Sequence, residues 1–176
     1  GYAQSRGSKG EGSERSATGA RTQGTSSLTV NGGTVRAVST VADSNQAVLE
    51  AFGINNEATG SSVTVNGGSV EAVAYNDFAF GIRGAGTVTV TGGKISAYAD
   101  HERGAPNIIG LAMFSGTANV SGGYFKAYSL TPEGITAGIR ANQGSTVNVS
   151  GGAFEINKVA EANFVLANGG TVNYED

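Results

Sequence analysis

Residues 87–100, TVTVTGGKISAYAD, contain the pattern that decides the fold. Thr and Val alternate over 87–91, so that one face of this segment is apolar and the other carries hydroxyl groups, as in a strand with one buried face. Gly92 and Gly93 then permit a sharp turn, because glycine adopts backbone angles that are closed to other residues. A second alternating segment follows over 94–99. The unit is therefore two strands joined by a glycine corner.

This unit recurs along the whole chain. Related segments begin at Ser27 (SLTVNGGTVRAV), Ser62 (SVTVNGGSVEAV), Thr117 (TANVSGGYFKAY), Thr146 (TVNVSGGAFEIN) and Thr171 (TVNYED). A short apolar segment, AFGI in two cases, precedes the next copy and supplies a third strand. Three short strands per copy predict an all-β fold, a right-handed parallel β-helix (β-solenoid) of about five three-strand coils.

Stacked coils turn equivalent positions into columns about 4.8 Å apart. Six apolar columns are expected to point inward and form the core. Two of them are Phe52, Phe80, Ile109, Ala137 and Phe164, and Ile54, Ile82, Leu111, Ile139 and Leu166. One outward row has charges of opposite sign at both of its ends, which predicts ion pairs that hold the coils in register. This row is Arg36, Glu71, Ser96, Lys126 and Glu155.

Composition bears on several classes of function. A net charge of −3 gives no reason to expect nucleic-acid binding. No apolar run approaches the length that spans a bilayer, so we expect no membrane insertion. The absence of cysteine excludes a disulfide framework and thiolate metal sites. The first residue is Gly1 rather than Met, which suggests either a processed N-terminus or a residue left by cloning. Removal of a signal peptide would place the protein outside the cell.

Residues 1–26 differ from the rest in being rich in Gly, Ser, Thr and charge. Four basic and two acidic residues give this segment a charge of +2, whereas seven basic and twelve acidic residues give 27–176 a charge of −5. Such a composition cannot bury a core of its own. We therefore expect an extended N-terminal arm over 1–26, ordered on a neighbouring surface, and a β-solenoid domain over 27–176.

The repeat, G-I followed by V-T-V-x-G-G-x-V-x-A over 27–174, resembles those of extracellular bacterial right-handed parallel β-helix proteins, including carbohydrate-binding and adhesin types. The resemblance implies a place outside the cell or at the cell surface. In calcium-binding, pectin-binding members, acidic residues come just before the G-I. Here those positions hold Ala51 and Phe52, Ala79 and Phe80, and Thr136 and Ala137. The metal sites therefore do not carry over, and no metal or other cofactor is expected.

Few side chains are suited to catalysis. His101, the only histidine, lies in the sequence DHERG, where adjacent loop residues cannot converge on one substrate atom. The strand carboxylates Glu71 and Glu155 are three coils apart. We therefore predict no catalytic residue and no enzyme. Tyr98 and Tyr128, on neighbouring coils, are candidate glycan contacts, or alternatively a cross-strand pair that stabilises the sheet.

The array has no recognisable cap at either end. The last copy stops at TVNYED, and Leu28 and Val30 begin the first coil. An open coil exposes apolar side chains and strand edges, and the opposite end of an identical chain is a complementary partner for it. The sequence thus predicts an extracellular structural protein that self-associates as a subunit of a surface filament or appendage. Its assembly residues would be Tyr2, Arg6, Lys9, Arg15, Arg21, Leu28, Val30, Val172 and Tyr174.

The alternative is a carbohydrate-binding or adhesin module of a larger bacterial cell-surface protein. Its partner would be a polysaccharide rather than a second copy of the chain. Tyr98 and Tyr128 would then provide the contacts.

Overall fold

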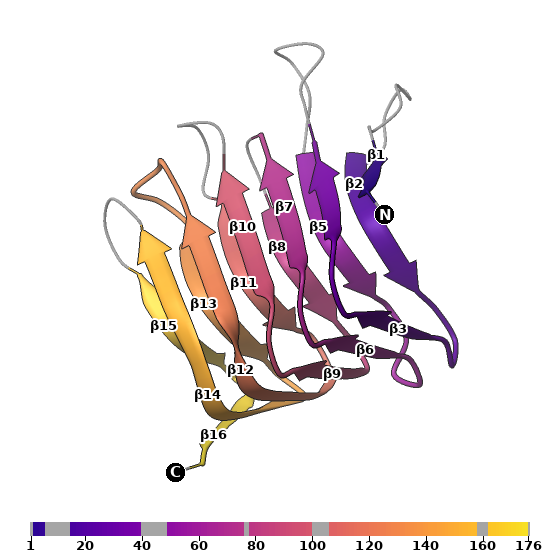
Figure 1. Cartoon of the computed structure of the whole chain (residues 1–176). Helices are drawn as coiled ribbons and strands as arrows, with labels where there is room; N and C mark the ends of the chain where they lie inside the picture. The colour runs from indigo at the N-terminus through magenta and orange to yellow at the C-terminus, as the bar shows by residue number, and fades with distance from the viewer. Residues whose placement is uncertain are drawn as a thin grey trace.

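The structure, a computed structural model, describes residues 2–5, 15–39, 49–75, 78–99, 106–157 and 162–175. In this part of the chain there is no helix, and successive strands wind about one axis as a solenoid (Figure 1). Every pairing between named strands is parallel. The predicted β-solenoid is confirmed, and its number of coils is close to the five expected.

The strands form two sheets. The larger, ten-stranded sheet contains β1 (Tyr2–Ser5), β3 (Ser27–Val30), β4 (Thr34–Val38), β6 (Ser62–Val65), β7 (Ser69–Ala74), β9 (Thr87–Val90), β10 (Lys94–Ala99), β12 (Gly116–Tyr128), β14 (Ser145–Asn157) and β16 (Thr171–Tyr174). The smaller, six-stranded sheet contains β2 (Arg15–Thr22), β5 (Leu49–Asn56), β8 (Phe78–Gly84), β11 (Asn107–Met113), β13 (Ile135–Asn142) and β15 (Asn163–Asn168).

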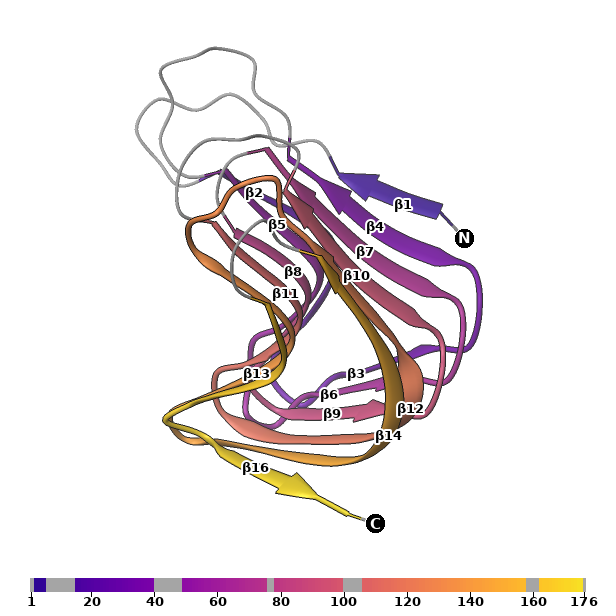
Figure 2. The same ribbon diagram turned by 90° about the vertical axis from the view of Figure 1, so that its left-hand side faces the viewer.

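The larger sheet bends through a corner, which gives the coil three sides (Figure 2). The corner lies at the glycine pairs, where the second glycine has a positive φ: 75° at Gly33 and Gly68, and 80° at Gly93. Only glycine adopts this conformation without strain, which confirms the corner predicted from the sequence. In the later coils, β12 and β14 pass through the corner as continuous strands, with a register shift after Val120.

Apolar side chains from all three sides fill the inside of the coil. Fully buried members include Ile54, Val63, Val65, Val70, Ile82, Ile95, Leu111, Phe125 and Ile139. Where β4, β7 and β10 approach β5 and β8, most of the buried side chains are alanines instead of larger residues. These are Ala37, Ala51, Ala72, Ala74, Ala79, Ala97 and Ala99. Small side chains let the two sheets lie close together, so the cross-section narrows there.

A column of glycines bends the smaller sheet. A Cβ atom at Gly53, Gly81 or Gly110 would lie 2.5–2.6 Å from the carbonyl oxygen of the next glycine in the column. On either side of this column Ala51 and Ile54 both pack into the interior, although they are three residues apart. The strands therefore bend at the glycines, and the smaller sheet is concave on its outer face (Figure 2).

The bend overturns one prediction. Phe52, Phe80, Ile109 and Ala137 do not join the interior but form a separate apolar cluster on the concave outer face. The strict alternation that placed them inside is interrupted at the glycine, because the chain changes direction there.

The last coil differs from the prediction by one residue. Asn163, not Phe164, pairs with Ala137, and Val165, not Leu166, packs against the interior cluster. Phe164 thereby takes the position that glycine holds in the earlier coils.

The N-terminal boundary of the solenoid also needs correction. β2 pairs with β5 of the same chain, and β1 pairs with β4. Ala17 is 1% exposed and packs with the alanine cluster. The polar segment becomes ordered here because the coil beneath supplies both a strand edge and an apolar surface. Residues 15–26 thus belong to the first coil rather than to an arm on a neighbouring molecule.

The predicted row of charges is present. Arg36 Nε lies 3.0 Å from Glu71 Oε2, and Lys126 Nζ lies 2.6 Å from Glu155 Oε1. Each pair joins neighbouring coils. Exposed pairs of this kind add less than about 1 kcal/mol each, so their role is to fix the register more than to stabilise the fold.

Candidate functional site

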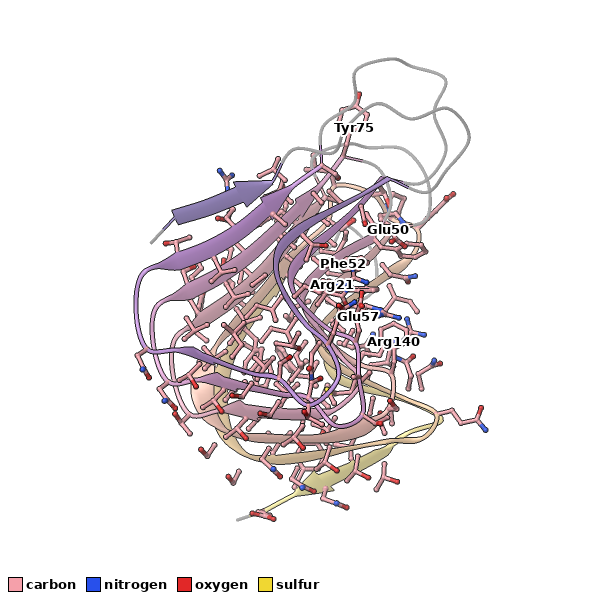
Figure 3. The ribbon with its side chains drawn as sticks, turned by 90° about the vertical axis from the view of Figure 1, so that its right-hand side faces the viewer. Arg21, Glu50, Phe52, Glu57, Tyr75 and Arg140 are labelled. Atoms are coloured by element: carbon pink, nitrogen blue, oxygen red, sulfur yellow. The ribbon has the colours of Figure 1, made fainter. Side chains whose placement is uncertain are left out.

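The concave outer face of the smaller sheet contains a groove of about 510 Å³. Its lining comes from β2, β5, β8, β11 and β13, together with the residues that follow these strands, so it runs along the solenoid axis across several coils. Figure 3 shows Glu50, Phe52, Glu57 and Arg140 on this side of the sheet, with Arg21 beside them. The groove exists because the glycine column bends every strand in the same direction.

Phenylalanine rings form the floor of the groove. The ring centroid of Phe80 lies 5.7 Å from that of Phe52, 6.0 Å from that of Phe78 and 5.8 Å from that of Phe114. Phe52 and Phe80 are each 6% exposed, whereas Phe114 is 37% exposed. Phe114 is therefore the most exposed ring in the groove, and Phe78 is half-buried.

Arg83 lies above this floor. Its guanidinium carbon is 4.8 Å from the centroid of the Phe114 ring and 6.0 Å from that of Phe52. Its Nη1 donates a hydrogen bond of 3.2 Å to Asn55 Oδ1. Contact with ring faces attracts the cation without neutralising its charge.

Glu57 accepts hydrogen bonds at the N-terminal end of the groove. Arg21 Nη2 lies 2.5 Å from its Oε2, and both Gln23 Nε2 and Asn55 Nδ2 donate to its carboxylate. Burial raises the pKa of Glu57, but the hydrogen bonds from Arg21 and Gln23 and the charges of Arg21 and Arg83 outweigh it, so the pKa lies below its ordinary value. Glu57 is therefore ionised at neutral pH and already paired.

Arg140 lies at the other end of the groove. Its Nε atom is buried and has no hydrogen-bond partner among the residues that the structure describes. Burial lowers the pKa of its guanidinium, because the charged form loses water. Unlike Arg21, Arg140 has no ion pair within the described residues.

These features give a ligand several kinds of contact. The groove offers two cations, an apolar floor, amide groups and the carboxylates of Glu50 and Glu57. Within the described ranges, no three His, Cys, Asp or Glu side chains lie where they could hold a metal ion, and no helix could cross a membrane. His101 lies outside the described residues.

The predicted assembly residues lie at the two ends of the coil stack. At the N-terminal end Leu28 is half-buried and Val30 is 5% exposed. At the C-terminal end Val172 is half-buried and Tyr174 is 70% exposed. Arg21 makes the ion pair with Glu57 described above.

The remaining assembly residues come from the N-terminal segment. Tyr2 lies in β1 and Arg15 begins β2, but their side chains are outside what the structure describes. Arg6 and Lys9 lie wholly outside the described residues.

The two candidate glycan contacts are neighbours. Tyr98 on β10 pairs in register with Tyr128 on β12. Both line a shallow pocket of about 330 Å³ on the outside of the larger sheet, which the Arg36–Glu71 ion pair also borders. The predicted placement of these two residues on neighbouring coils is confirmed, and their role as glycan contacts stays a prediction.

The groove residues were missed by the sequence reasoning. The alternating pattern places Phe52 and Phe80 in the interior, and no motif marks Arg83 or Arg140. The available signal was the glycine in the middle of each strand, since glycine inside a strand often marks a bend.

Comparisons of the chain with protein-family models, with curated proteins and with solved structures found no match.

Proposed function

We propose that this chain is a structural protein that associates end to end through its coils, as a subunit of a filament or appendage outside the cell. The observation that carries this proposal is the apolar C-terminal face of the coil stack. Two large apolar side chains are more than half exposed among the described residues, Phe164 at 63% and Tyr174 at 70%, and both belong to the last coil. Another coil stacked on the last one would cover both side chains.

The first coil has strand edges that match those of the last coil. β3 is the last strand of its side of the larger sheet, and β2 is the last strand of the smaller sheet. β16 has the sequence TVNY and β3 has SLTV, so a neighbouring copy placed on the last coil would continue the same columns. Parallel edges with matching columns support head-to-tail contact, which repeats without closing.

An asparagine ladder on the outside of the coil also supports end-to-end association. Asn148 Nδ2 donates to Asn119 Oδ1 and Asn173 Nδ2 donates to Asn148 Oδ1, each at 2.8 Å. Each amide thus donates toward the preceding coil. This direction leaves the Asn173 carbonyl oxygen available to a donor on a following coil. Thr29, in the equivalent position of β3, carries a hydroxyl group that can donate.

The mass of the particle in solution tests this proposal. The unmodified chain should give a mass that rises with concentration above the 17.6 kDa of one copy, measured by light scattering. Replacing both Phe164 and Tyr174 with lysine places two charges in the apolar contact, where their burial costs free energy, so this variant should stay near the mass of one copy. Since both side chains are exposed, the fold should be retained.

The matched control carries the same two charges away from the ends. Thr87→Lys and Ser121→Lys change exposed residues in the middle of the array. This variant should associate like the unmodified chain. An unmodified chain that keeps the mass of one copy at every concentration would contradict the proposal.

A carbohydrate-binding or adhesin module is the second candidate, favoured by the pocket beside Tyr98 and Tyr128. Aromatic faces of this kind bind the apolar faces of sugars. If this is the function, the chain retains glycans on an array, and the Tyr98→Ala, Tyr128→Ala double variant loses that signal by about tenfold or more. An array without signal for the unmodified chain leaves the structural role as the better account.

A further inference from the structure

Arg83 and Arg140, the two arginines of the groove, differ from Arg21 and Arg36 by having no carboxylate in direct contact among the described residues. Arg21 and Arg36 each form an ion pair. Arg83 instead contacts two aromatic rings and an amide, and Arg140 has a buried Nε without a partner. The groove therefore carries two positive charges that its described side chains do not neutralise by direct contact.

The positions of these arginines define a spacing. Arg83 pairs in register with Ala112, and Ala112 pairs in register with Arg140. Neighbouring strands are about 4.8 Å apart, so the two backbone positions are separated by about 10 Å along the solenoid axis. Ala112 leaves room between them, and the exposed ring of Phe114 lies beside Arg83.

Three further polar residues line the groove: Glu50 already has an interaction of its own, while Ser16 and Asn107 each carry a donor and an acceptor. The cations that line it are the guanidinium groups of Arg83 and Arg140.

The acceptors beside Arg83 are engaged, because Asn55 Oδ1 accepts from Arg83 and the Glu57 carboxylate accepts from three side chains. The hydroxyl groups of a neutral sugar would leave both of these guanidinium charges without a counter-ion. A carboxylate needs donors only, and an apolar side chain needs only a surface such as Phe114.

We propose that this groove binds an acidic peptide segment of a partner protein. One carboxylate contacts Arg140, a second contacts Arg83, and an apolar side chain between them packs on Phe114. In a polyproline II conformation, residues three apart lie on the same side and about 9 Å apart, which matches the spacing of the two arginines. Arginine pairs with carboxylates through two parallel hydrogen bonds, which provides specificity for this charge.

The test is the binding of a fluorescent nonapeptide with the central sequence Glu-Pro-Phe-Glu, followed by fluorescence anisotropy. The unmodified chain should bind it. The Arg140→Gln variant should bind it at least about tenfold more weakly, because one carboxylate loses its partner. The control Arg36→Gln removes an arginine on another face and should bind within about twofold of the unmodified chain.

A second experiment changes the peptide instead of the protein, in case Arg140→Gln alters the fold. The peptide with Gln-Pro-Phe-Gln at its centre should bind at least about tenfold more weakly than the acidic one. Absence of binding to the acidic peptide, or equal binding of both peptides, would overturn the proposal. So would an oligogalacturonate of equal charge that binds more tightly than the acidic peptide, because the groove would then select a glycan.

Discussion

Replacing Gly81 with valine is expected to destabilise the fold severely. A Cβ atom at this position would lie 2.6 Å from the carbonyl oxygen of Gly110 and 2.6 Å from Ile95 Cγ2. The first contact is with backbone, which cannot move aside by changing rotamer. The coils would have to separate locally, and the bend of the smaller sheet would be lost. We expect the free energy of unfolding to fall by about 3 kcal/mol or more, at the upper end for overpacked interiors.

Urea denaturation followed by circular dichroism measures this loss. The control is Gly32→Val, at a glycine where a Cβ atom would meet no atom within 4 Å. Both variants add the same β-branched side chain, so the difference between them reports the crowding at the glycine column. Similar stability losses in the two variants would show that the column does not determine the bend.

The main architecture could be predicted because its signal is repeated. The alternation around Val88 and Val90 specifies a strand with one buried face, and Gly93 specifies the corner that follows. The same pattern occurs in every copy, so a copy that departs from it at one position can still be assigned from the others. The structure confirms the corner through the positive φ of Gly93 and its equivalents.

The direction of the phenylalanine column could not be predicted from a period of two. Alternation places Phe52 and Ile54 on the same face, and both are apolar. The chain bends at Gly53, so that Ala51 and Ile54 share the interior and Phe52 points outward. Apolar residues on both faces of a strand do not distinguish the two arrangements. The local signal is Gly53, which marks a bend but does not give its direction.

The groove was unpredictable for a related reason. Arg83 and Arg140 are far apart in the sequence and belong to no motif. They come into one column only when the lengths of the intervening loops and the register of β8, β11 and β13 are known. The concave shape that exposes them also depends on the bend at the glycines.

The N-terminal segment shows the limit of compositional reasoning. Residues 15–22 contain too few apolar side chains to form a core, which predicted an arm held by another molecule. The edge of β5 supplies backbone partners within the same chain, and Ala17 needs only a small apolar surface. The composition of a segment tells how much apolar surface it can bury by itself. It does not tell whether a neighbouring strand has an open edge with which the segment can pair.

End-to-end contact makes a specific prediction about distances between two copies. If β16 of one copy lies beside β3 of the next in continued register, then Asn173 lies beside Thr29. Adjacent strand positions have Cα atoms about 5 Å apart, within the range that a disulfide bridges. The chain contains no cysteine, so introduced cysteines have no competing partner. Within one copy the two residues lie at opposite ends of the array, about 24 Å apart, and cannot form a bond.

The most direct test is therefore oxidation of the Thr29→Cys, Asn173→Cys double variant, followed by electrophoresis without reductant. We expect a ladder of covalent oligomers that disappears on reduction, whereas either single variant stops at the dimer. A control pair, Thr29→Cys with Thr171→Cys, shifts one cysteine by two residues and should form few oligomers. A ladder from the in-register pair that is no stronger than the control would contradict coil-on-coil stacking between copies.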